Sequence, residues 1–138
     1  MIKPESNIIF ASTGQKLAIV IPKMESVSNT IFMTEEADLL QVGIIKTDKE
    51  RGIPKHRHLN FERNLNQTAE YLLVRSGSCK VLIWENIESK AHSILMEPGD
   101  SILLLNGIHA LESLTEDLEL LEIKQGPYAG VMDKELID

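Results

Sequence analysis

The chain has 138 residues, 43% of them hydrophobic, which is the size of one domain with a single core. With 14 Lys plus Arg against 21 Asp plus Glu, its formal net charge is −7, which disfavours binding to nucleic acid. The apolar run 17–22 is too short to cross a bilayer. We expect a cytoplasmic protein with no cleaved leader and no membrane partner, and its single cysteine, Cys79, also fits a reducing compartment.

Short apolar runs separated by turn residues predict an all-β fold with little helix. The predicted strands, all rich in branched or large apolar residues, are 39–47, 70–75, 80–84, 92–96, 101–105 and 118–124. Such frequent strands with short turns favour an antiparallel sandwich or barrel. Residues 34–40 and the end of 126–138 are weak helical competitors, because neither has a sustained 3.6-residue apolar stripe.

Two strand patterns predict how the strands are buried. Residues 102–105 are apolar without interruption, so both faces of this strand need a cover, either a second sheet or a second subunit. For that reason we expect a homodimer. In the strand 80–84, Val81 and Ile83 share one face with Cys79, which indicates a buried cysteine and not a nucleophile.

His56 and His58 are the first candidate metal ligands. Pro54 favours extended backbone, so we expect residues 54–58 to begin a strand. Residues two apart in a strand point to the same side, which would direct both imidazoles to one point. Imidazole nitrogen is a good ligand for first-row divalent metals.

A carboxylate would complete such a site, and two glutamates are candidates. Glu62 is nearer to the histidines but lies in a polar stretch of loop character. Glu70 begins the strand 70–75, whose inward residues would be Glu70, Leu72 and Val74, so its position is more rigid. We favour Glu70, with Glu62 as the alternative.

His109 is the expected fourth ligand. It follows the buried strand 101–105 and a turn at Gly107, and it begins another extended segment. His92 begins a strand without other ligand types nearby, so we expect it to be structural. For each candidate ligand a solvated or hydrogen-bonded strand residue is the alternative interpretation.

Together these residues resemble the two motifs of the cupin superfamily. Gly52, His56, His58, Glu70 and Gly77 are similar to the first motif, and Gly99, Gly107 and His109 are similar to the second. Eleven residues separate His58 from Glu70, where the usual motif has three or four, so a loop, 59–69, would be inserted at the barrel mouth.

The resemblance implies a cupin-type double-stranded β-helix, a jelly-roll barrel, with a single domain over 1–138. The barrel core would span about 40–125, with N-terminal strands in 1–38 and a C-terminal tail at 126–138. It also implies one divalent transition metal, and the nitrogen and oxygen donors accept Fe, Mn, Ni, Zn or Cu.

Three functions remain open from the sequence. The first is a small metalloenzyme, of isomerase or dioxygenase type, acting on a small polar or sugar-like molecule. The second is a non-catalytic module that binds a metal or ligand, and the third is a metal-free sugar isomerase or epimerase with a histidine base. Gln41, Arg63 and Gln125 are the tentative ligand-binding residues, although solvent-facing amides are an equal interpretation for the two glutamines.

Overall fold

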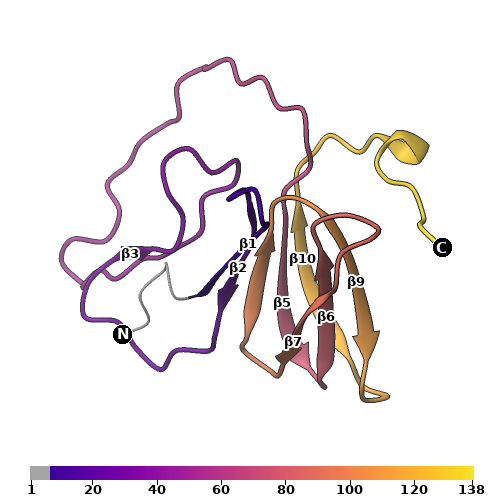
Figure 1. Cartoon of the computed structure of the whole chain (residues 1–138). Helices are drawn as coiled ribbons and strands as arrows, with labels where there is room; N and C mark the ends of the chain where they lie inside the picture. The colour runs from indigo at the N-terminus through magenta and orange to yellow at the C-terminus, as the bar shows by residue number, and fades with distance from the viewer. Residues whose placement is uncertain (1–6) are drawn as a thin grey trace.

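The computed structural model describes residues 7–138, which form strands, turns and one short 3-10 helix, η2 (Gly130–Met132). The strands are β1 (Ile8–Phe10), β2 (Lys16–Ile21), β3 (Ile31–Phe32), β4 (Gly43–Ile44), β5 (Glu70–Ser76), β6 (Cys79–Trp84), β7 (His92–Met96), β8 (Ser101–Leu104), β9 (Ile108–Ser113) and β10 (Glu119–Lys124). A five-stranded sheet has the order β1-β2-β8-β5-β10, a three-stranded sheet has the order β7-β6-β9, and β3 pairs with β4 (Figure 1). The all-β prediction is confirmed.

The two larger sheets share the main core. On β6, Cys79, Val81 and Ile83 are buried and the residues between them are partly exposed, as the period-two pattern predicts. Leu72 and Val74 of β5 contribute to the same cluster from the other sheet. Burial raises the pKa of the Cys79 thiol, so this side chain stays protonated and packs as a small apolar group.

Strand β8 is buried on both faces, and this chain supplies the cover on each side. Ile102 and Leu104 belong to the main core, whereas Leu103 and Leu105 belong to a second cluster. Residues in the range 24–42, including the buried Met33, complete that second cluster. The uninterrupted apolar run therefore does not require a second subunit.

An ion pair fastens this covering segment to the five-stranded sheet. Lys16 Nζ on β2 lies 3.0 Å from both carboxylate oxygens of Asp38. The side chains are only 15% and 11% exposed, so solvent screens the pair less than it would at the surface. Asp38 also accepts a hydrogen bond from the backbone N–H of Glu35, which shapes the turn.

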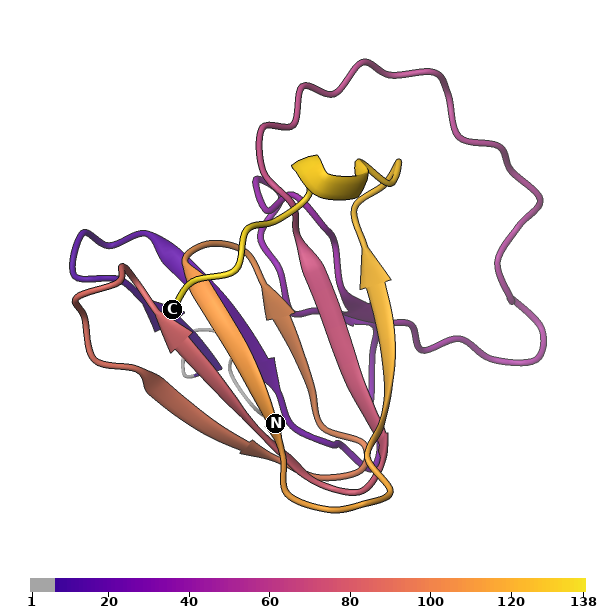
Figure 2. The ribbon, with the colours of Figure 1, turned by 90° about the vertical axis from the view of Figure 1, so that its right-hand side faces the viewer.

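Strands β9 and β10 are edge strands, and Figure 2 views the molecule from their side. Within residues 7–138, β9 pairs only with β6, and β10 pairs only with β5. Residues 45–69 contain no strand, and residues 45–68, all exposed, form a long arc that extends away from the sheets (Figures 1 and 2). Two sheet edges thus keep free backbone N–H and C=O groups.

Most predicted strands are confirmed, with two corrections in residues 39–58. The strand expected at 39–47 is reduced to β4, and residues 54–58 are not a strand. Residues 34–40, a weak helical competitor in the sequence, consist of bends and turns. The physical reason is the lack of a partner: a strand needs a neighbour for its backbone hydrogen bonds, and only the two residues of β3 pair with this region. The N-terminal strands are β1, β2 and β3, and residues 1–6 lie outside the described part of the chain.

The turn before β9 generates a stability prediction. Gly107 has φ +85°, and a Cβ there would lie 2.5 Å from the carbonyl oxygen of Trp84. Gly14 has almost the same φ, +87°, with open space around it. We expect Gly14→Ala to cost about 1 kcal/mol from backbone strain alone, and Gly107→Ala to cost clearly more because backbone must also move. Urea unfolding of both variants measures this, and equal losses would contradict the close approach.

Candidate metal site

Glu70 and His109 form a contact between the two sheets. Glu70 is the first residue of β5, and His109 is the second residue of β9. His109 Nε2 lies 3.2 Å from Glu70 Oε2, with the side chains 41% and 18% exposed. Both residues have the parity of the buried core positions of their strands, Leu72 on β5 and the partly buried Leu111 on β9. This pair of predicted ligands is thus at the rim of the main core.

Three further charged side chains adjoin this pair, two of them on β10 and one in the tail that follows it. The sheet register places Lys124 opposite Glu70 and Glu122 opposite Leu72, so both share the inner face with Glu70. Lys124 Nζ in turn lies 3.2 Å from Asp133 Oδ2 in the tail that follows β10. We call Glu70, His109, Glu122, Lys124 and Asp133 the rim cluster.

Hydrogen bonding shifts the pKa values of the neighbouring Glu70 and Glu122 in opposite directions. The bond from His109 is the main cause that lowers the pKa of Glu70 to about 2, against the opposing effect of desolvation. The hydrogen bond with ionised Glu70 and then desolvation raise the pKa of Glu122. Asp133 chiefly raises the pKa of Lys124. A proton entering the glutamate pair therefore resides on Glu122, while Glu70 stays ionised and accepts the hydrogen bond from His109.

Sequence reasoning missed Glu122, Lys124 and Asp133. The segment 118–124 is a predicted strand, and its inward residues alternate as Leu120, Glu122, Lys124. Two charged residues at inward positions are a signal of a polar site, because charges are seldom placed toward a core without partners. Asp133 had no such signal, since its contact with Lys124 depends on how the tail turns back.

His56 and His58 lie on the exposed arc, away from the rim cluster. Their ring centroids are 5.3 Å apart with an interplanar angle of 78°. His56 Nδ1 is 2.8 Å from the carbonyl oxygen of Pro54, which favours the tautomer with the proton on Nδ1 and leaves Nε2 as a lone-pair donor. Glu62, the alternative carboxylate, is exposed on the same arc.

The structure thus brings the four predicted ligands together as two pairs, Glu70 with His109 and His56 with His58. It does not join the pairs: among residues 7–138, no group of three or more His, Cys, Asp or Glu side chains is arranged to hold a metal ion. The donors on hand are imidazole nitrogen and carboxylate oxygen, which suit a divalent transition metal. Three carboxylates and one ammonium group also make the rim cluster attractive to a cation.

The three residues expected to bind a ligand have different surroundings. Gln41 is exposed and does not face a barrel interior; its amide nitrogen donates to the carbonyls of Glu35 and Asp38, both at 2.9 Å. Arg63 lies on the arc, with its guanidinium carbon 4.8 Å from the ring centre of Phe61. Gln125 follows β10 and is half-buried, and its backbone N–H donates to the carbonyl of Ala69 at 3.0 Å.

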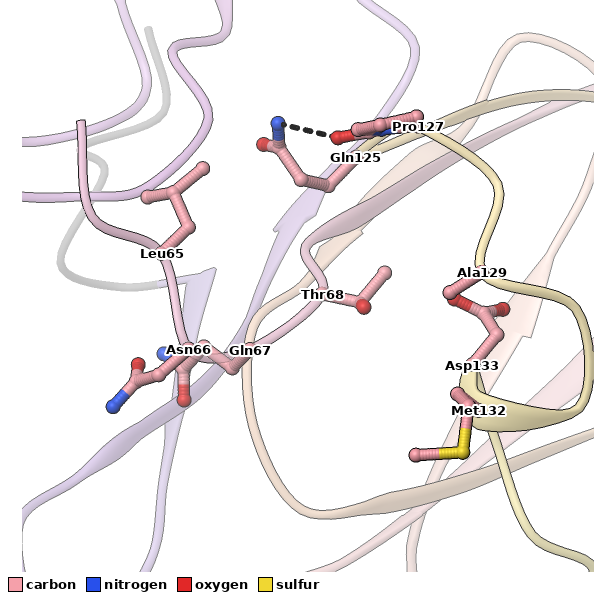
Figure 3. Close-up of a pocket in the computed structure, with 10 residues that line it drawn as sticks. Leu65, Asn66, Gln67, Thr68, Gln125, Pro127, Ala129, Met132 and Asp133 are labelled. Atoms are coloured by element: carbon pink, nitrogen blue, oxygen red, sulfur yellow. Dashed lines mark hydrogen bonds between the residues drawn. The ribbon is translucent and has the colours of Figure 1, made fainter. Parts of the chain in front are cut away.

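Gln125 lines an open pocket of about 300 Å³ (Figure 3). Residues 65–68 form one wall, and the opposite wall consists of residues 125–127 with Ala129, Met132 and Asp133. In Figure 3 the side chain of Thr68 points from the first wall toward Ala129 and Asp133 of the second. Asp133 belongs to both the pocket and the rim cluster, so the two features are contiguous.

Comparison with known proteins gives no relative: no family model matches the chain, and no curated protein or solved structure is significantly similar to it. Among residues 7–138, no helix has the length and apolar character needed to span a membrane.

The Glu70 contact predicts a pH-dependent stability difference. Because the Glu70 pKa is lowered from 4.5 to about 2, the ionised carboxylate stabilises the fold above pH 4.5, and this contribution is lost as the pH falls through about 2. In metal-free protein we expect Glu70→Gln to lower the free energy of unfolding most near neutral pH, with the loss shrinking in acid.

Urea unfolding at about pH 7, 5 and 3 measures this difference. Glu112→Gln is the matched control, because Glu112 is an exposed residue of β9 with the opposite strand parity to His109. A deficit of Glu70→Gln that stays constant or widens toward low pH would show that His109 does not stabilise ionised Glu70.

Proposed function

We propose that this protein is a small metalloenzyme of the cupin type, which binds one divalent transition metal through His56, His58, Glu70 and His109. The observation that carries the proposal is the Glu70–His109 contact of 3.2 Å, made by side chains of opposite sheets at the rim of the core. Two donors from distant parts of the chain meet there, as a metal site between two sheets needs.

The free edge of β9 offers a place for the histidine pair. A strand laid along that edge would lie about 5 Å from β9, and its inward residues would lie beside His109. Residues 54–58 suit such an added strand. His56 and His58 would share its inward side, while Lys55 and Arg57 would face away. Pairing would also satisfy backbone groups that the edge leaves free.

Charge supports the same arrangement. The arc segment 54–58 carries Lys55 and Arg57 besides its histidines, whereas the rim cluster contains three carboxylates and one ammonium group. Opposite charge favours their approach, and a divalent cation between imidazoles and Glu70 would strengthen it. When bound, a metal with open positions polarises a carbonyl or hydroxyl oxygen of a substrate, or activates dioxygen if it is iron.

Glu122 would then be the residue that exchanges a proton with the substrate. Its position on the inner face of β10, opposite Leu72 and beside Glu70, places a carboxyl group close to any molecule held at the site. Isomerisation of a small polar molecule needs such a group near the polarised oxygen, so the rim cluster supports an isomerase more directly than a simple binding module.

The second candidate is a metal-free isomerase or epimerase in which His109 is the base. The same contact favours it, because a carboxylate that accepts a hydrogen bond from imidazole fixes the ring tautomer and supports proton abstraction by the other nitrogen. Under this alternative His56 and His58 have no role in the reaction.

Metal content separates the two candidates. We expect protein exposed to Mn, Fe, Ni, Zn or Cu and then dialysed to retain about one equivalent of at least one ion, because a four-donor site binds its metal tightly. Loss of a ligand in His109→Ala, Glu70→Gln or the double variant His56→Ala/His58→Ala should weaken retention by at least about tenfold. Elemental analysis of each dialysed sample measures it.

His92→Ala is the matched control, since His92 is an exposed histidine of β7 outside the proposed ligand set. It should retain as much metal as the unaltered chain. Less than about a tenth of an equivalent in the unaltered protein would overturn the metal proposal and leave the metal-free candidate.

A further inference from the structure

The side chains that line the open pocket beside the rim cluster indicate which class of ligand it would bind. Asn66, Gln67 and Gln125 contribute carboxamides, and Thr68 contributes a hydroxyl. Each carboxamide provides both donors and an acceptor, and a hydroxyl also does both. Such groups match ligand hydroxyls, which likewise donate and accept.

The pocket wall offers no free positive charge. Among residues 7–138, Asp133 is the only residue lining the pocket with a charged side chain, and Lys124 Nζ lies 3.2 Å from its carboxylate. An anionic ligand would find no counter-charge in the wall and would face the carboxylates of the neighbouring rim cluster. The wall therefore disfavours an anion, and its neutral hydrogen-bonding groups suit an uncharged molecule.

Apolar groups complete the lining. Leu65, Pro127, Ala129 and Met132 stand among the polar groups, so a ligand with one carbon-rich face and several hydroxyls would meet both kinds of surface. A volume of about 300 Å³ is at the lower end for small-molecule sites and suits a single six-membered ring with its substituents.

The two walls are held together next to Glu70. The backbone N–H of Gln125 donates to the carbonyl of Ala69 at 3.0 Å, and Ala69 directly precedes Glu70. Lys124, next to Gln125 in the chain, lies opposite Glu70 in the sheet register, and its Nζ contacts Asp133 of the second wall at 3.2 Å. A ring bound in the pocket would thus have its edge at the rim cluster.

We propose that this pocket binds a neutral, polyhydroxylated six-membered ring, of the size of one monosaccharide or cyclitol. The role of that molecule as a substrate rests on the function proposed above, but its binding does not. Gln125 is the central hydrogen-bonding residue, because its backbone is fixed to Ala69 and it is half-buried, whereas Asn66 and Gln67 are exposed. Its side-chain nitrogen donates to the carbonyl of Gly126 at 3.4 Å, which leaves the side-chain oxygen to accept from a ligand hydroxyl (Figure 3).

Binding is tested on the metal-free protein, so that its result is independent of the metal proposal. Glucose, mannose, galactose and myo-inositol are titrated while the side-chain amide signals of the ¹⁵N-labelled protein are recorded. At least one should cause saturable shifts of the Asn66, Gln67 and Gln125 signals. Glucose 6-phosphate and gluconate, the charged probes, should bind more weakly.

Gln125→Ala should raise the dissociation constant about three- to tenfold, the effect of one neutral hydrogen bond. Asn60→Ala removes a carboxamide from the same arc but outside the pocket wall, so it should change nothing. If Gln125→Ala disturbs the fold, as its backbone amide spectrum would show, Asn66→Ala replaces it. No saturable shift with any neutral probe, tighter binding of the charged probes, or an equal loss in Asn60→Ala would overturn the proposal.

Discussion

The contact between Glu70 and His109 is the interaction on which the site depends. It requires β5 and β9, from different sheets, to present these side chains on facing surfaces. Leu72 and Val74 fix the inward face of β5, and the close approach of Gly107 to Trp84 fixes where β9 begins. The well-packed core therefore positions one half of the proposed ligand set before any metal binds.

The other half of the ligand set lies on a segment that lacks this support. Residues 45–68 are exposed throughout, so ordering them along an edge strand costs conformational entropy that apolar burial does not offset. Metal coordination by His56 and His58 would supply the compensating free energy, together with new backbone hydrogen bonds on β9. Metal binding and closure of the arc would then be one coupled event.

Local patterns predicted the fold better than the site. The alternation around Cys79 and the apolar run 102–105 determine burial within a strand, and both were read correctly because period-two side-chain direction is a local property. Strand pairing in 39–58 and the position of Asp133 beside Lys124 depend on partners distant in the sequence, which no local pattern specifies. Glu122 and Lys124, the charged inward residues of β10, could have been predicted from the strand alternation, because that alternation is also a local property.

The most direct test of the account uses the four histidines as their own probes. In protein labelled with ¹⁵N-histidine, titration with Zn²⁺ reports on each imidazole separately. We expect the signals of His56, His58 and His109 to change together up to one equivalent of Zn²⁺, while the signal of His92 is unaffected. If His109 does not respond when His56 and His58 do, or if none responds at one equivalent, the two pairs do not meet around one ion and the proposed site is wrong.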